Sequence, residues 1–105
     1  MRLPIPKTYG AMKKKHPRLI AAYEALGEAC KDAGPLDAKA SALVKLALAI
    51  GVAHEGATHS AARKALEAGC SPEELLHVAT LGTTTLGFPA MMRARSWVQD
   101  VLDGN

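Results

Sequence analysis

The segment from Ala40 to Ile50, ASALVKLALAI, is apolar on nearly every side of a helix, with Ser41 and Lys45 as its polar exceptions. A surface helix has one apolar stripe, whereas a helix that is apolar all round is stable only when neighbours cover it. Asp37 precedes the segment and is a candidate N-cap. The segment therefore predicts a central helix in a helical bundle.

The helix before this segment is predicted to begin at Pro17, because proline suits the first turn of a helix. It ends at Gly34-Pro35. Its apolar residues recur at helical intervals and form one stripe, in which Tyr23 is expected to be a core or subunit-interface residue. These residues are Leu19, Tyr23, Leu26 and Cys30.

Three more helices are expected after the central one. One begins near Ala53 or His54, carries many alanines and stops at Gly69, and the small side chains predict a close helix contact. The next begins with SPEE, in which Ser71 and Glu74 have the spacing of a capping box, and runs to Gly87. Pro89 opens the last, whose inner stripe is Met91, Ala94, Val98, Val101 and Leu102.

The composition agrees with an all-helical protein. Alanine, a strong helix former, is the most frequent residue, and no segment alternates with the period of two that a strand needs. With 105 residues the chain is expected to be one domain, 1–105, with a basic N-terminal arm over 1–16. A domain of this size buries a modest core, so oligomerisation is expected to add burial.

The charge does not point to a polyanion partner. The net charge is +3, but five of the 13 Lys and Arg residues lie between Lys7 and Arg18, as a basic arm would place them. No apolar run reaches the length of a membrane span, and the N-terminus lacks the apolar region of a secretory signal. We expect a soluble, cytoplasmic protein with no nucleic-acid or membrane partner.

The candidate chemistry lies in Glu55 and His59. At spacing i and i+4 the two side chains share one helix face, and a carboxylate orients a neighbouring imidazole and favours its protonated form. Such a pair is the minimum for general acid–base catalysis. The alternative is a solvated surface pair, and the small apolar residues around the pair favour the functional interpretation.

Three further residues are weighed beside this pair. His54 is either a third site residue or an exposed loop histidine, and it does not share a helix face with His59, so we expect no metal site. Thr84, in the run LGTTTLGFP, is a candidate for a pocket wall, although packing with hydroxyl bonds to preceding carbonyls explains that run more simply. Arg63 lies one turn beyond His59 and is a candidate to hold an anionic substrate.

From Leu36 to Ala94 the sequence resembles the carboxymuconolactone decarboxylase family, which includes alkyl hydroperoxidase D. The resemblance rests on the apolar helix after Leu36, on ALEAGCSPEE and on the turn GFPA. It implies an alkyl hydroperoxidase D-like bundle of five to six helices, assembled into trimers or hexamers with sites near subunit contacts. The decarboxylase branch implies a lyase that acts without metal or other cofactor.

The hydroperoxidase branch carries a C-x-x-C-x-x-x-H motif that this sequence lacks. The three matching positions hold His54, Ala57 and Ala61, so peroxide reduction by a dithiol is disfavoured and the family's peroxiredoxin activity is a label only. The two cysteines, Cys30 and Cys70, lie 40 residues apart and match neither a disulfide framework nor a zinc spacing.

Three hypotheses follow, in this order. The first is a cofactor-free acid–base enzyme acting on a small organic acid or lactone, with Glu55, His59 and His54 as catalytic residues and Arg63 and Thr84 as substrate-binding residues. The second is a non-catalytic oligomeric binding or accessory protein, since the family's characteristic thiols are absent. The third is a peroxidase that uses Cys70 or Cys30.

Overall fold

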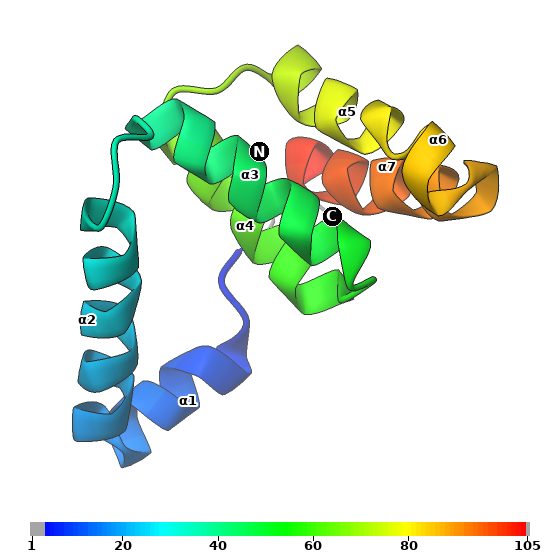
Figure 1. Ribbon diagram of the computed structural model, residues 1–105. Coiled ribbons are helices and arrows are strands. Elements are labelled where there is room, and N and C mark those ends of the chain that lie inside the picture. The colour runs from blue at the N-terminus through cyan, green and yellow to red at the C-terminus, as the bar shows by residue number, and fades with distance from the viewer. Residues whose placement is uncertain (1–3, 105) are drawn as a thin grey trace. The chain divides into compact units, whose positions relative to one another are not determined.

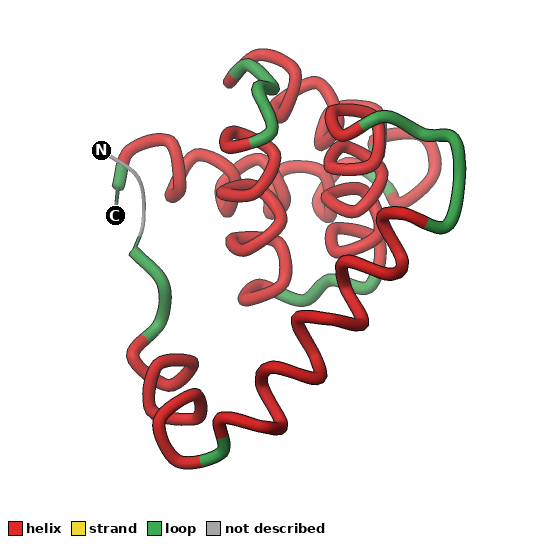
Figure 2. The backbone as a smooth tube through the Cα atoms, turned by 90° about the vertical axis from the view of Figure 1, so that its left-hand side faces the viewer, coloured by secondary structure: helices red, strands yellow, loops and turns green. Residues whose placement is uncertain are grey.

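The computed structural model describes residues 4–104, in which every regular element is a helix (Figures 1 and 2). The chain divides into two compact units, Pro4–Asp37 and the residues from Ala38 onward. The all-α prediction is confirmed. Apart from the single turn α6, the described residues form six helices, within the predicted range of five to six. The helices are α1 (Lys7–Lys15), α2 (Pro17–Asp32), α3 (Ala38–Gly51), α4 (Glu55–Glu67), α5 (Pro72–Leu81), α6 (Thr83–Leu86) and α7 (Phe88–Asp103).

The predicted basic arm contains a helix, α1, which the sequence analysis did not anticipate. Three lysines fill its last turn, where they interact favourably with the negative end of the helix dipole. Two contacts reach from α1 to Glu24 on α2: the Tyr9 hydroxyl donates to its carboxylate at 2.5 Å, and the Lys13 ammonium lies 3.7 Å from it. The arm is therefore held to α2 by polar contacts.

Helix α2 begins at Pro17, as predicted, but its apolar stripe is not buried. Leu19, Tyr23 and Leu26 are each more than half exposed, and Ile20 is the residue of α2 that is buried. The spacing correctly identified an amphipathic helix. Of the two places expected for Tyr23, its exposure excludes the core of the described chain, and the subunit interface stays a prediction.

The second unit is built around α3, α4, α5 and α7. Helix α3 packs on α4, α4 on α7, and α5 on both α3 and α7 (Figure 1). The small residues of α4 allow the predicted close contact, since Ala62 and Ala65 have no exposed surface. The larger core side chains lie around them: Leu46, Ile50, Leu75, Val98 and Val101.

Helix α5 begins with the predicted capping box. The Glu74 backbone N–H donates to Ser71 Oγ at 3.1 Å, and the Ser71 N–H donates to the Glu74 carboxylate at 2.8 Å. The prediction that this helix continues to Gly87 was wrong, because it ends at Leu81 and Gly82 separates it from α6. The Thr83 hydroxyl donates to the Thr80 carbonyl at 2.6 Å, the back-bonding expected for the threonine run.

Helix α7 follows Gly87 and matches its predicted inner stripe. Met91, Ala94, Val98 and Val101 are buried, and Leu102 is partly buried beside the core. Across residues 4–104, no helix combines the length and the apolar character required to cross a bilayer.

Candidate functional site

The connection between α3 and α4 sets the start of the candidate site. Helix α3 continues through Gly51, and Ala53 then adopts the left-handed conformation with φ of 57°. The Ala53 N–H bonds the Ile50 carbonyl at 3.0 Å and the His54 N–H bonds the Ala49 carbonyl at 3.3 Å. These two bonds are those of a Schellman motif, which satisfies the last carbonyls of a helix.

His54 is the N-cap of α4. Its Nδ1 accepts a hydrogen bond from the Ala57 N–H at 3.0 Å, and its carbonyl accepts one from the Thr58 hydroxyl at 2.8 Å. The His54 ring lies against Gly56, where a Cβ atom would come within 3.3 Å of ring carbon Cε1. His54 therefore fixes the start of α4 and makes Glu55 the first residue of this helix.

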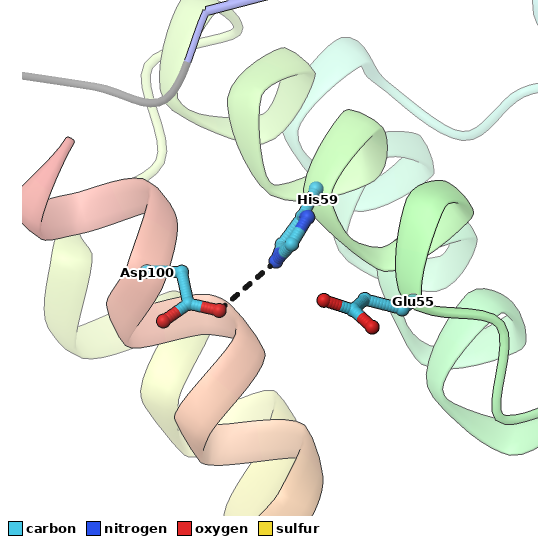
Figure 3. A group of neighbouring side chains, drawn as sticks. All are labelled: Glu55, His59 and Asp100. Atoms are coloured by element: carbon cyan, nitrogen blue, oxygen red, sulfur yellow. Dashed lines mark hydrogen bonds and ion pairs between the residues drawn. The ribbon is translucent and has the colours of Figure 1, made fainter. Parts of the chain in front are cut away.

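The side chains of Glu55, His59 and Asp100 converge between α4 and α7 (Figure 3). One ligand-type atom from each residue lies within 4.8 Å of the other two. His59 Nε2 is 3.2 Å from Asp100 Oδ2, across 41 residues of sequence. The imidazole thus has a carboxylate from its own helix and a second carboxylate from α7, and we call these three residues the triad.

The triad is partly shielded from water. The His59 side chain is 15% exposed and that of Asp100 is 37% exposed, whereas Glu55 is an exposed residue. His59 does not project into bulk solvent, and Glu55 is not enclosed by the described residues of one chain. The triad therefore opens to the surface on the side of Glu55.

Asp100 is the member of the triad that the sequence analysis missed. Its sequence signal is an acidic residue close to the C-terminal end of α7, where the helix dipole disfavours negative charge. It also lies between the buried residues Val98 and Val101. An acidic side chain at such a position indicates a partner elsewhere in the fold, but the sequence does not say which.

The other predicted site residues lie outside the triad. Arg63 is one turn beyond His59 on α4, and its Nη1 is shielded from solvent with no hydrogen-bond partner among the described residues. Thr84 is exposed on α6, which precedes the first turn of α7, whereas Asp100 lies near the last turn of that helix. The structure therefore does not bring Thr84 to Glu55 and His59.

The cysteines do not form a dithiol centre beside the triad. Cys70 is buried in the second unit, and its thiol faces the Lys39 carbonyl at 3.7 Å. Cys30 is exposed on α2, in the other unit. Neither is part of a disulfide among the described residues.

An open apolar groove of about 570 Å³ lies elsewhere on the second unit. It runs between α3 and the α5–α6 segment, and the triad does not line it. The polar side chains that line it include Glu74, His77 and Thr85. The groove and the triad are therefore separate features of this unit.

Comparison with known proteins shows which family the chain resembles. A model of the carboxymuconolactone decarboxylase family matches residues 17–100. The crystal structure of an apo carboxymuconolactone decarboxylase family protein from Legionella pneumophila matches with a TM-score of 0.76 over 92% of this chain and 87% of that one. The identity is 23%, so this likeness shows the fold.

One curated relative matches a shorter part of the chain. An uncharacterized protein of Haemophilus influenzae is 39% identical over 46 residues, which are 44% of this chain and 41% of that protein. The match thus spans about two fifths of that relative's length.

Proposed function

The chain belongs to the carboxymuconolactone decarboxylase family, as its sequence resemblance predicted, and on this premise we propose that it is a cofactor-free acid–base enzyme. The proposed substrate is a small organic acid or lactone. The observation that carries the proposal is the triad, in which one imidazole lies between two carboxylates from different helices. The rest of the proposal assigns a role to each member.

Glu55 is proposed to exchange the proton with the substrate. It is the exposed member of the triad, so a substrate reaches its carboxylate without rearrangement of the core. His59 lies behind it, one helical turn along α4, and is proposed to take up or supply that proton. A carboxylate beside an imidazole orients the ring, and an oriented imidazole is a general acid–base group.

Asp100 is proposed to position His59. Its Oδ2 lies 3.2 Å from Nε2, a distance at which a protonated ring nitrogen donates to the carboxylate. That bond selects the tautomer and holds the plane of the ring. Asp100 therefore acts through His59, and its loss should lower the rate without removing the group that meets the substrate.

Arg63 is proposed to bind the anionic group of the substrate. A shielded guanidinium N–H without a partner costs about 1–3 kcal/mol, and a carboxylate ligand would recover that cost. Its place on α4, one turn beyond His59, puts it on the helix face of the triad. A shift of the Arg63 side chain toward the exposed edge would be required for this contact.

The proposal is tested by incubating the protein with a panel of small lactones and their hydroxy- and oxo-acids, and by following conversion with proton NMR. His59→Ala and Glu55→Gln should each lower the rate about 100-fold or more. His16→Ala is the matched control, because this exposed histidine lies between α1 and α2, outside the triad and the groove, and its loss should leave the rate unchanged. Equal rates in the His59 variant and the wild type would contradict the proposal.

The second candidate is a non-catalytic binding protein, and the apolar groove favours it. A groove of about 570 Å³ that is lined mainly by apolar side chains and does not contain the triad offers a separate binding surface. A metabolite that remains bound after purification and that is displaced by Val78→Lys, but not by His59→Ala, would support this function over the first. The peroxidase alternative has no dithiol centre beside the triad to support it.

A further inference from the structure

The triad also has the geometry of a divalent metal site. Each of its three residues offers one metal-ligand atom, and these atoms lie within 4.8 Å of one another (Figure 3). No other such group of His, Cys, Asp or Glu is found within residues 4–104. We propose that Glu55, His59 and Asp100 bind one zinc-class divalent ion, and that this ion blocks the acid–base chemistry of the same site. The blocking effect rests on the proposed function, whereas the binding itself does not.

The distances fit a metal after a small movement. With metal–ligand bonds of about 2.0–2.2 Å, tetrahedral ligand atoms are about 3.4 Å apart. His59 Nε2 and Asp100 Oδ2 are already 3.2 Å apart, and all three ligand atoms lie within 4.8 Å. The adjustment falls on Glu55, whose exposed side chain changes rotamer freely.

The arrangement on two helices gives the site a fixed part and an adjustable part. His59 and Asp100 come from packed helices, and their facing atoms are held by the contact of α4 with α7. Glu55 precedes His59 by four residues, a spacing at which two side chains of one helix bind the same ion. An ion at this place joins α4 to α7.

Charge favours a cation at this place. Two carboxylates and a neutral imidazole carry a total charge of about −2, which a divalent ion neutralises. A nitrogen lone pair directed at a carboxylate oxygen 3.2 Å away is repelled unless a proton or a metal ion lies between them. The same two atoms therefore accept either a proton or a metal.

The ligand types select the class of ion. One imidazole nitrogen with two carboxylates suits zinc, and also manganese or iron, whereas magnesium and calcium prefer oxygen ligands alone. Three protein ligands leave at least one position for water. When the ion occupies Nε2, the proton on that nitrogen leaves to solvent, so the imidazole no longer exchanges protons with Glu55.

The test measures zinc binding directly by isothermal titration calorimetry with Zn²⁺ alone. Cys30 is an exposed thiol and thiolate is a zinc ligand, so all proteins carry Cys30→Ser to remove this second source of zinc binding. Glu55→Gln, Asp100→Asn and His59→Gln remove one ligand each, and the first two preserve side-chain shape. His77→Gln is the control for an exposed histidine that does not belong to the triad.

The expected result is one Zn²⁺ ion per chain, bound more tightly than Mg²⁺ and weakened about tenfold or more in each triad variant but not in the control. Circular dichroism shows that each variant is folded. Absence of saturable zinc binding, or equal affinity in wild type and triad variants, would overturn the proposal. If zinc binds as expected and no lactone or acid is converted by the metal-free protein, the metal site stands and the proposed enzymatic function fails.

Discussion

At the scale of single residues, Ala53 and Gly69 both end a helix in the left-handed conformation, although only one of them is glycine. Each occupies the left-handed position that follows a helix, with φ of 57° and 96° respectively. After α4 the Gly69 N–H bonds the Leu66 carbonyl and the Cys70 N–H bonds the Ala65 carbonyl, the same pair of bonds found after α3. Alanine pays a steric penalty at this position that glycine avoids.

Two single substitutions at these positions should change the free energy of unfolding in opposite directions. Ala53→Gly should raise the free energy of unfolding by up to about 1 kcal/mol, because it relieves the left-handed strain. Gly69→Ala should lower it by about 1 kcal/mol, through strain alone, since an added Cβ meets nothing within 4 Å. Urea denaturation of the two variants and the wild type measures both changes. A loss of stability in Ala53→Gly would show that Ala53 makes contacts that outweigh its backbone strain.

The sequence identified two residues of the triad and missed the third for a physical reason. Glu55 and His59 are four residues apart, and helical geometry alone brings their side chains together. Asp100 meets His59 through the packing of α7 on α4, across 41 residues, and no local pattern encodes that contact. The role of His54 was also hidden, because an N-cap depends on where the preceding turn places the ring.

At the scale of helices, the capping box of α5 was the most predictable element. Ser71, Pro72 and Glu74 contain the whole signal in four successive residues, and both hydrogen bonds formed as expected. Helix α1 was missed, since it has no buried residue and no side-chain N-cap bond. The break at Gly82 was missed too, because glycine is tolerated within many helices.

The capping box should make the stability of the protein depend on pH. The hydrogen bond from the Ser71 backbone N–H, with Lys39 nearby, lowers the pKa of the Glu74 carboxyl. A lowered folded-state pKa contributes stability above the unfolded value, about 4.3 for Glu, and this contribution is lost as the pH falls through the folded value. The advantage of wild type over Glu74→Gln should therefore be larger at about pH 7 than at about pH 3.

Chemical denaturation of both proteins at the two pH values provides this measurement. Glutamine keeps an oxygen that accepts the Ser71 N–H but does not titrate, so the comparison isolates the charge. An advantage of wild type that is the same at both pH values would contradict the assigned role of the carboxylate.

At the scale of the whole molecule, one face of α3 remains uncovered within its own unit. Leu46, Ala49 and Ile50 are buried, as the apolar segment predicted, but Val44 and Leu48 are 46% and 63% exposed. The sequence predicted cover on nearly every side of this helix, and the described residues cover only part of it. It did not specify whether the cover comes from the same chain, because an apolar pattern contains no information on which surface it meets.

We expect a second copy of the chain to cover this face. Most oligomers of soluble proteins are symmetric assemblies of one chain, and the exposed side chains of α3 lie in a row at i and i+4. Leu48→Gln should then weaken association about tenfold or more, since a buried leucine contributes about 1.5–3 kcal/mol. Sedimentation velocity over a range of concentrations measures this effect.

Lys45→Gln on the same helix is the matched control, because this polar residue is exposed and should not alter the assembly. A wild type that sediments as a single chain at every concentration would contradict the prediction that a second copy covers this face.

The loop between α3 and α4 contains no residue beyond those that end one helix and begin the next. This restricts how the number of residues in the loop can vary among related sequences. The second Schellman bond comes from His54, and His54 is also the N-cap of α4. The bonds that end α3 and the bond that begins α4 therefore meet at one residue. One inserted residue would separate the Schellman bonds from the N-cap at His54 and so change where Glu55 and His59 lie relative to Asp100. Related sequences that keep this triad should therefore differ by substitution in this loop and not by insertion or deletion.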